Sequence, residues 1–171
     1  MQNAIEKQLP IDIELNAERD ATYSGICLKQ NEELTLLLNF DYDLGEYNGF
    51  TILRTAEIDE FSPWEEEDLQ DIKNDNKDKQ LEGLDLSQIN TFADALDYLK
   101  QEALISIFVD EDDEETDGYL VGRVRQVEAD QLHIRLIDEA SNWLDTEILP
   151  VAVVHYIGFK TQYEFDLAAS L

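Results

Sequence analysis

The sequence predicts a mainly β protein made of two duplicated small-barrel modules that a helical connector joins. Three observations predict this fold: segments with the alternating pattern of half-buried strands, a spacing that occurs in both halves of the chain, and a helical pattern between them. We expect the first module at residues 9–61, the connector at 62–102 and the second module at 103–167.

Apolar and polar residues alternate along two segments, which is typical of antiparallel strands with one buried face. We expect three side chains in each half to face inward: Leu34, Leu36, Leu38, Leu132, Ile134 and Leu136. The dipeptide Asn48–Gly49 predicts a tight hairpin turn, because both central positions of such a turn need a positive φ.

The same spacing of apolar residues occurs twice. Laid over each other without a gap, the halves match at five places: Leu34 with Leu132, Leu36 with Ile134, Leu38 with Leu136, Phe50 with Ile148, and Phe61 with Phe159. Gly25 matches Gly122 after an adjustment of one residue. A glycine inside the second of four to five short strands predicts a bent meander that closes into a small barrel. Few matched residues are identical, so a true duplication and two unrelated meanders that share a spacing both remain open.

Two helices are expected in the connector. Ser62 to Glu65 has the form of a capping box with proline at the first helical position, and the acidic residues that follow suit the positive end of a helix dipole. A second helix is predicted at about residues 91–101, with Thr91 or Asn90 as its cap. Between them, residues 74–79 are too polar to pack, and we expect a loop there.

The second half of the chain carries several local patterns: Val121 to Val124, Leu132 to Leu136, Ser141 to Asp145, and Ile157 to Tyr163 with Leu167. In these it resembles small bacterial proteins thought to form Sm-like or SH3-like β-barrels. The resemblance covers about residues 104–167 and, more faintly, 11–61. It implies an α+β protein with two duplicated SH3-like or Sm-like modules. It implies no particular activity, because such barrels host many functions.

The chain carries far more negative charge than solubility requires. Its 171 residues include 40 Asp and Glu against 12 Lys and Arg, a formal net charge of -28. Self-repulsion on that scale destabilises the compact state. The functions that such a charge could serve are repulsion from nucleic acid and anionic membranes and attraction to basic proteins. The alternative is that the acidity belongs to a halophilic or generally acidic proteome.

Cys27 is the only cysteine, so the chain forms no intramolecular disulfide, and a reducing compartment is expected. The sequence shows no apolar run of the length of a signal peptide or a membrane span. We therefore expect a cytoplasmic protein without membrane contact.

No catalytic set stands out. The two histidines, His133 and His155, lie in predicted strand segments, and no phosphate loop, nucleophile elbow or His-Glu metal motif occurs. We expect no catalytic residues, no enzyme activity, no cofactor and no metal. Cys27, Trp64 and Trp143 are interpreted as packing residues by default, with a role as a partner anchor as the alternative for Trp143.

An acidic run suggests a calcium loop, because Asp113, Glu115, Asp117 and Gly118 match the opening spacing of an EF-hand. The twelfth position is Val124, where such a loop needs a bidentate carboxylate, so specific calcium binding is not expected. The simpler interpretation is a solvated hairpin tip between a strand that ends at Val109 and one that begins near Gly118.

The predicted partner-binding residues are the acidic run, the acids after Trp64 and one tryptophan in a predicted turn: Asp110, Glu111, Asp112, Asp113, Glu114, Glu115, Asp117, Glu65, Glu66, Glu67, Asp68 and Trp143. Direct nucleic-acid binding is disfavoured, because acids outnumber the few basic residues and duplex affinity rests on cations. The expected partner is a basic protein, such as a toxin or an enzyme that acts on nucleic acid.

The functional hypothesis is a non-catalytic acidic protein that inhibits or sequesters this basic partner, first of all a bacterial immunity protein against a nuclease-type toxin. Two alternatives remain: a phage-type DNA mimic that inhibits a defence enzyme, and a structural or regulatory adaptor whose acidity is incidental. The sequence predicts neither the identity of the partner nor the oligomeric state.

Overall fold

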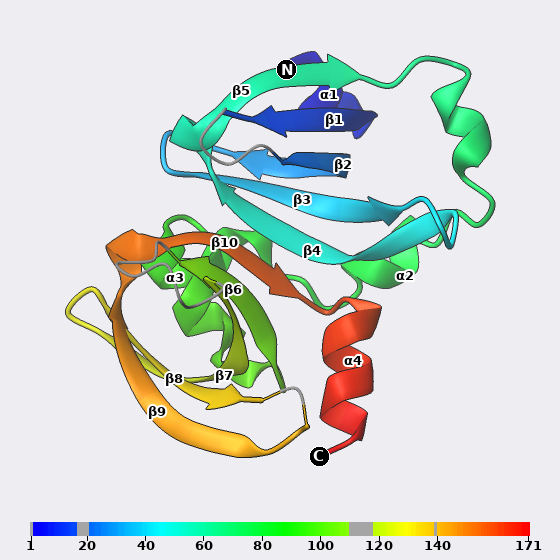
Figure 1. Ribbon diagram of the computed structural model, residues 1–171. Coiled ribbons are helices and arrows are strands. Elements are labelled where there is room, and N and C mark those ends of the chain that lie inside the picture. Colours follow the sequence, from blue (N-terminus) through cyan, green and yellow to red (C-terminus); the bar gives the residue numbers. More distant parts are fainter. Residues whose placement is uncertain (1, 17–20, 110–117, 139) are drawn as a thin grey trace. The chain divides into compact units, whose positions relative to one another are not determined.

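The computed structural model describes residues 2–16, 21–109, 118–138 and 140–171, and it divides into two compact units (Figure 1). The first unit ends at Leu84 and the second begins at Asp85, so the boundary falls inside the predicted connector. Each unit consists mainly of antiparallel strands with short helices, which confirms the prediction of a mainly β protein. In the described part of the chain, no helix is long and apolar enough to cross a bilayer.

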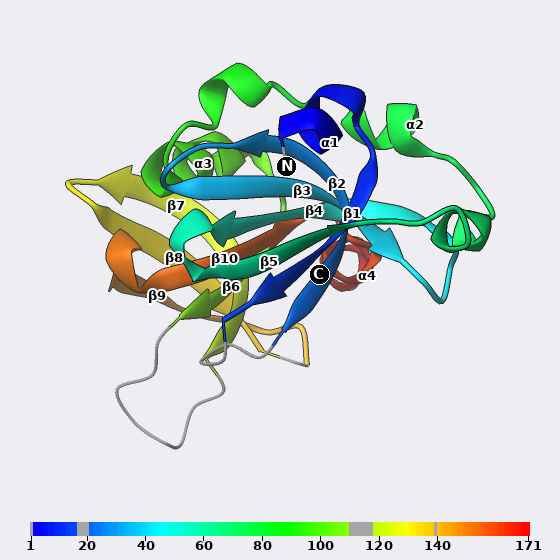
Figure 2. The same ribbon diagram turned by 90° about the horizontal axis from the view of Figure 1, so that it is seen from above.

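The strands of the first unit lie in the order β5-β1-β2-β3-β4, with antiparallel neighbours, as Figure 1 shows; Figure 2 gives the view from above. With η marking 3-10 helices, its described elements are α1 (Gln2–Lys7), β1 (Pro10–Leu15), β2 (Thr22–Gln30), β3 (Leu34–Asp41), β4 (Glu46–Arg54), η1 (Thr55–Glu57), β5 (Ile58–Pro63), η2 (Asp68–Asp71) and α2 (Lys77–Leu81).

The strands of the second unit lie in the order β10-β6-β7-β8-β9, again antiparallel. Its described elements are η3 (Leu86–Gln88), α3 (Phe92–Tyr98), η4 (Leu99–Gln101), β6 (Ile105–Val109), β7 (Tyr119–Glu128), β8 (Gln131–Ile137), β9 (Trp143–Pro150), η5 (Val151–Val153), β10 (Val154–Phe159) and α4 (Gln162–Ala169).

Both units have the same topology. In each, the fifth strand follows a 3-10 helix and returns to pair with the first strand. The ladder between the second and third strands shifts its register between Cys27 and Lys29 in one unit and between Val124 and Gln126 in the other. The ladder between the third and fourth strands also shifts in both units.

The second strand of each unit carries a glycine against the third strand. A Cβ atom on Gly25 would lie 2.0 Å from the carbonyl oxygen of Leu38, and one on Gly122 would lie 2.4 Å from the carbonyl oxygen of Arg135. Any side chain would therefore clash with backbone at these points, which explains why a glycine stands inside each strand.

The strand pairing displaces the expected match between the halves by one residue. Gly25 pairs with Asn39 and Gly122 pairs with Leu136, so Leu136 takes the place of Asn39 and not that of Leu38. The predicted triplets are nonetheless all buried: Leu34, Leu36, Leu38, Leu132, Ile134 and Leu136. The displacement is invisible in the pattern because β3 is buried on both faces, including at Thr35 and Leu37.

The hairpin turn predicted at Asn48–Gly49 is wrong, because both residues lie inside β4. The chain reverses after Asp41, whose carboxylate accepts hydrogen bonds from two backbone N–H groups of the turn. Gly49 has a φ of 67°, and Asn48 and Gly49 together lie opposite the single residue Asn39. This arrangement is a β-bulge, which needs a positive φ just as a tight turn does.

The helix predicted to begin at Ser62 is also wrong. Ser62 and Pro63 belong to β5, where Pro63 pairs with Ile11 of β1. Proline is tolerated at the end of this strand, which is the outermost strand of the unit's order, because a missing N–H there need not break a ladder. Pairing along β1 thus outweighs the local capping signal.

The second predicted connector helix is confirmed. The side chain of Thr91 accepts a hydrogen bond from the backbone N–H of Asp94, which caps α3 as expected. One face of the helix and of the turn that follows is buried, with Phe92, Ala95, Leu96 and Leu99.

The segment predicted as a polar loop instead docks on β4 through its amide side chains. Asn76 accepts a hydrogen bond from the N–H of Tyr47 through Oδ1 and donates to the carbonyl of Tyr47 through Nδ2, at 2.9 Å each. Gln80 of α2 donates to the same carbonyl through Nε2 at 3.0 Å. A segment without apolar residues therefore packs here by hydrogen bonding to strand backbone.

The C-terminal helix α4 was not predicted. Thr161 and Glu164 form a reciprocal capping box at its start. Glu164 is only 4% exposed, and its carboxylate also accepts a hydrogen bond from Ser106 of β6 at 2.5 Å. One side chain thus both caps the helix and fastens it to the sheet of the second unit.

Candidate functional site

A stacked pair of aromatic rings, one exposed and one half-buried, lies in the first unit. Tyr42 stands in the turn after β3, and Trp64 follows β5 directly. Their rings stack with centroids 5.7 Å apart and planes inclined by 29°. Tyr42 is 50% exposed, so this pair offers aromatic surface to solvent.

Trp64 is held on several sides. Its indole Nε1 donates a hydrogen bond of 2.9 Å to the carboxylate of Asp12, and its backbone N–H donates to the carbonyl of Pro10. Phe40 packs edge-on against the ring, with centroids 5.0 Å apart. These contacts give Trp64 the packing role that was predicted and fix the surface on which Tyr42 rests.

Three carboxylates act electrostatically on the Tyr42 hydroxyl. Burial raises the pKa of Tyr42 above its ordinary value, a hydrogen bond with Ser24 lowers it, and the negative charges of three aspartates raise it further: Asp12, Asp68 and Asp71. The phenol therefore remains neutral at physiological pH, in a negative potential. We call Asp12, Tyr42, Trp64, Asp68 and Asp71 the acidic aromatic surface.

The predicted acidic residues of the first unit are sequence neighbours of this surface or belong to it. Glu65, Glu66 and Glu67 follow Trp64 and are exposed. Asp68 accepts a hydrogen bond of 2.7 Å from the backbone N–H of Glu65, which folds the acidic segment back into a turn. The structure thus brings predicted acids together with an aromatic pair that was not predicted to bind a partner.

The other predicted acidic run, Asp110 to Asp117, lies outside the described residues. The strand ends on either side are as expected: β6 ends at Val109, whose N–H donates to the carbonyl of Gly118 at 2.8 Å, and β7 begins at Tyr119. Partner binding by the acidic run stays a prediction.

Trp143 begins β9 and is half-buried against the second unit. Its ring packs against a cluster formed by Leu104, Val121 and Ile137. The structure gives this side chain a packing role, and its use as an anchor for a partner stays a prediction.

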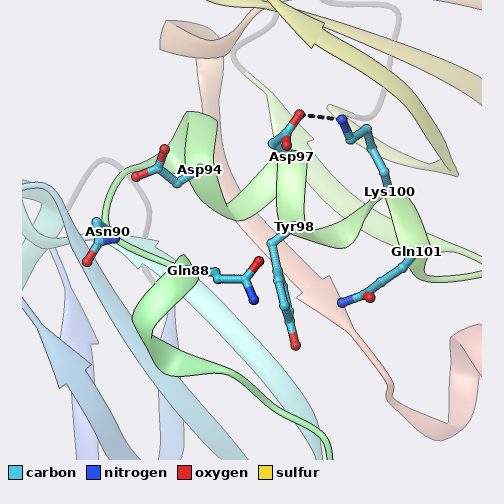
Figure 3. Close-up of a pocket in the computed structure, with 7 residues that line it drawn as sticks. All are labelled: Gln88, Asn90, Asp94, Asp97, Tyr98, Lys100 and Gln101. Carbon is cyan, nitrogen blue, oxygen red and sulfur yellow. Dashed lines mark ion pairs between the residues drawn. The ribbon is translucent and has the colours of Figure 1, made fainter.

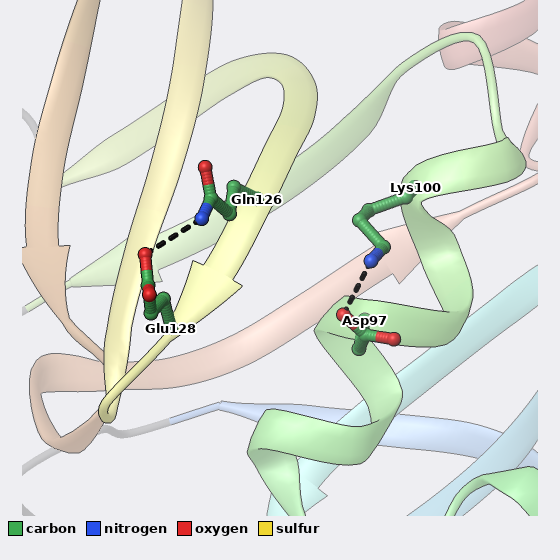
Figure 4. A network of polar contacts seen from close by, with 4 residues as sticks. All are labelled: Asp97, Lys100, Gln126 and Glu128. Atoms are coloured by element: carbon green, nitrogen blue, oxygen red, sulfur yellow. Dashed lines mark hydrogen bonds and ion pairs between the residues drawn. The ribbon is translucent and has the colours of Figure 1, made fainter.

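A polar hollow of about 590 Å³ lies along α3 and the turn that follows it (Figure 3). Asp97 and Lys100 form an ion pair of 2.6 Å on its wall, which Figure 4 shows together with the hydrogen bond from Gln126 to Glu128 on β7. The residues that line the hollow are Gln88, Asn90, Asp94, Asp97, Tyr98, Lys100 and Gln101. This lining combines amides and carboxylates and includes no histidine, cysteine or serine that a nucleophile–base pair would use.

A smaller, more apolar hollow of about 270 Å³ lies between β7, β8, β9 and α4. Asp138 stands on its wall, and hydrogen bonds from the backbone and side chain of Asn142 hold the pKa of this carboxyl below its usual range. Its volume is below the range typical of small-molecule sites.

The thiol of Cys27 is not poised as a nucleophile. Cys27 is 1% exposed, and burial raises its pKa to about 11. The thiolate is the reactive species, and at neutral pH this thiol keeps its proton. Among the described residues, no three His, Cys, Asp or Glu side chains are grouped so that they could hold a metal ion.

We predict that Cys27 reacts with Ellman's reagent far more slowly in the native protein than in urea.

The raised pKa also makes the stability depend on pH. The folded state binds the thiol proton more tightly than the unfolded chain, whose cysteine pKa is about 8.5. This contribution to stability is therefore present below about pH 8.5 and is lost as the pH rises toward 11. Urea unfolding from pH 7 to 10.5, with Cys27→Ala as the control, measures this loss. Native labelling as fast as that of the unfolded chain contradicts the prediction.

No protein-family model, curated protein or solved structure matches this chain.

Proposed function

We propose that this chain is a non-catalytic protein that binds a basic protein partner through the acidic aromatic surface of its first unit. The observation that carries the proposal is the stacked pair of the exposed Tyr42 and the half-buried Trp64, on which three carboxylates act, in a chain with a net charge of -28. A Lys or Arg side chain over an exposed aromatic ring gains about 0.5–1 kcal/mol, and more when water is excluded. Asp68 and Asp71 supply charges of the complementary sign.

The charges and the rings have different roles in this proposal. Exposed acids such as Glu65, Glu66 and Glu67 steer a basic partner and raise its association rate. A rigid aromatic pair supplies contact area with little conformational entropy to lose, and its contribution appears mainly in slower dissociation. A partner that satisfies both is a basic protein with Lys or Arg at the centre of its contact surface.

For the biological setting, we propose an inhibitor, with immunity against a nuclease-type toxin as the first interpretation. A nuclease needs a cationic cleft for its substrate, and an acidic surface with an aromatic centre is complementary to such a cleft. Purification of partners from the native cell tests this setting. Capture of a basic nuclease that the chain inhibits supports it, and capture of a partner without a cationic cleft contradicts it.

We also propose that the two units are copies of one SH3-like or Sm-like barrel. The proposal is supported by the shared strand order, by register shifts at matching places, and by the glycine at the same crossing in each unit. If the units are copies, alanine at Gly25 and at Gly122 destabilises each in the same way.

A lysine-rich peptide is a probe of the surface that does not require the native partner. We expect Asp68→Asn together with Asp71→Asn to weaken binding of the peptide about tenfold, which corresponds to about 1.4 kcal/mol. Calorimetry at physiological ionic strength measures this change. The matched control is Asp145→Asn with Glu147→Gln, which removes two exposed charges from β9.

The control separates a site from diffuse attraction to an acidic chain. We expect the β9 control to change the affinity by less than about twofold, because Asp145 and Glu147 belong to the second unit and are not part of the acidic aromatic surface. Equal weakening by both double variants contradicts the proposed surface. Tyr42→Ala is expected to speed dissociation of the peptide, and an unchanged dissociation rate contradicts the role of the aromatic pair.

A further inference from the structure

A feature of the opposite charge lies in the second unit. Three of the five arginines of the chain stand on the hairpin of β7 and β8, at Arg123, Arg125 and Arg135. Arg123 and Arg135 lie directly opposite each other in the ladder. Like charges in that position destabilise a sheet. Their pairing in so acidic a chain points to a role beyond packing.

Both guanidinium groups are fixed in place. Arg123 donates through Nε to the carbonyl of Ala103 at 3.0 Å, and Arg135 donates through Nε to the carbonyl of Leu144 at 3.3 Å. Their Cζ atoms lie 5.6 and 5.0 Å from the centroid of the Trp143 ring. One hydrogen bond and one aromatic ring thus orient each group before any ligand arrives.

Among the residues that the structure describes, most of their hydrogen-bonding capacity remains unused. A guanidinium group carries five N–H donors, and the Nε contact of each arginine uses one. Within the described ranges, neither group forms an ion pair with a carboxylate. Two positive charges and several Nη–H donors are therefore available on adjacent strands of the hairpin.

We propose that Arg123 and Arg135 form a binding site for a phosphate-type dianion, with Trp143 as its aromatic wall. Two cations match the charge of a phosphate group, and guanidinium N–H groups match the spacing of its oxygens. The phosphate belongs either to a free ion or to a monoester on a larger ligand. The site is independent of the proposed surface for a basic partner, because none of its residues belongs to the first unit.

Titration with inorganic phosphate, followed by the ¹⁵N–¹H signals of the arginine Nε groups and the tryptophan indoles, tests the site. We expect the signals of Arg123, Arg135 and Trp143 to shift together and to saturate at millimolar phosphate, while those of Arg125 and Trp64 stay in place. Arg123→Gln and Arg135→Gln are each expected to weaken binding at least tenfold. Arg125→Gln, on the same hairpin, is the matched control and is expected to change it by less than twofold.

One further variant and one further ligand complete the test. Arg135→Lys keeps the charge but removes the planar fork, so we expect weaker binding with unchanged stability of the second unit to urea. Phenyl phosphate represents a monoester, and tighter binding of it than of phosphate assigns the site to an esterified ligand. Shifts that do not saturate, equal weakening by Arg125→Gln, or equal affinity for acetate and phosphate each overturn the proposal.

Discussion

Gly25→Ala is expected to destabilise the first unit by more than about 3 kcal/mol, which is among the largest effects of a single substitution. The added Cβ would lie 2.0 Å from the carbonyl oxygen of Leu38, which is a backbone atom of the neighbouring strand. Gly122→Ala is expected to act in the same way on the second unit, where the contact is 2.4 Å. Relief of either clash requires two paired strands to move apart, because the atom nearest to the added Cβ is backbone in both cases.

Gly83→Ala is the matched control. Gly83 also has a positive φ, of 79°, but nothing lies within 4 Å of the added Cβ. Gly83→Ala is expected to lower the free energy of unfolding by only about 1–2 kcal/mol, because alanine is strained in the left-handed backbone conformation. Urea unfolding measures the losses, and the two tryptophans report on the units separately because Trp64 lies in one and Trp143 in the other. Equal destabilisation at Gly25 and Gly83 contradicts the explanation by steric contact.

Glu164→Ala is expected to destabilise the second unit by about 2–4 kcal/mol, because a lost cap and a lost buried hydrogen bond add together. The carboxylate accepts hydrogen bonds from the backbone N–H of Thr161 and from the hydroxyl of the fully buried Ser106. Alanine removes both contacts and leaves the hydroxyl without this acceptor. Glu164→Gln keeps a carbonyl oxygen as an acceptor, so it is expected to lose less stability than Glu164→Ala.

Asp166→Ala is the control for charge and helix propensity. Asp166 lies on the same helix, is exposed, and accepts a hydrogen bond from the side chain of Gln162. Its substitution is expected to change the stability by less than about 0.5 kcal/mol. Hydrogen exchange of the α4 amides, together with urea unfolding, measures both variants. A loss for Glu164→Ala no larger than that for Asp166→Ala contradicts the docking role.

The two capping-box sequences show how far local signals determine this fold. Ser62 to Glu65 has the signal but forms the end of a strand and a turn, whereas Thr161 to Glu164 has the same signal and does cap a helix. The difference lies in distant partners, because Pro63 pairs with Ile11 of β1. Strands with long alternating patterns and the helix capped by Thr91 were predictable, since their signals agree with their surroundings.

The candidate site was predictable only in part. The acids from Glu65 to Asp68 stand out as a run in the sequence. Tyr42 and Trp64 are far apart in the chain, and their stacking depends on β5 returning beside β1, which no local pattern specifies. The aromatic residue next to an acidic run was a visible signal, but its partner ring was not.

The amide contacts on β4 protect this strand from pairing with strands of other chains. A strand with free N–H and C=O groups is a template on which another chain can align, and such templates lead to aggregation. At Tyr47 the N–H is bound by Asn76, and the C=O is bound by both Asn76 and Gln80. An incoming chain would find these backbone groups already paired by side chains, so β4 is closed to templated growth at Tyr47.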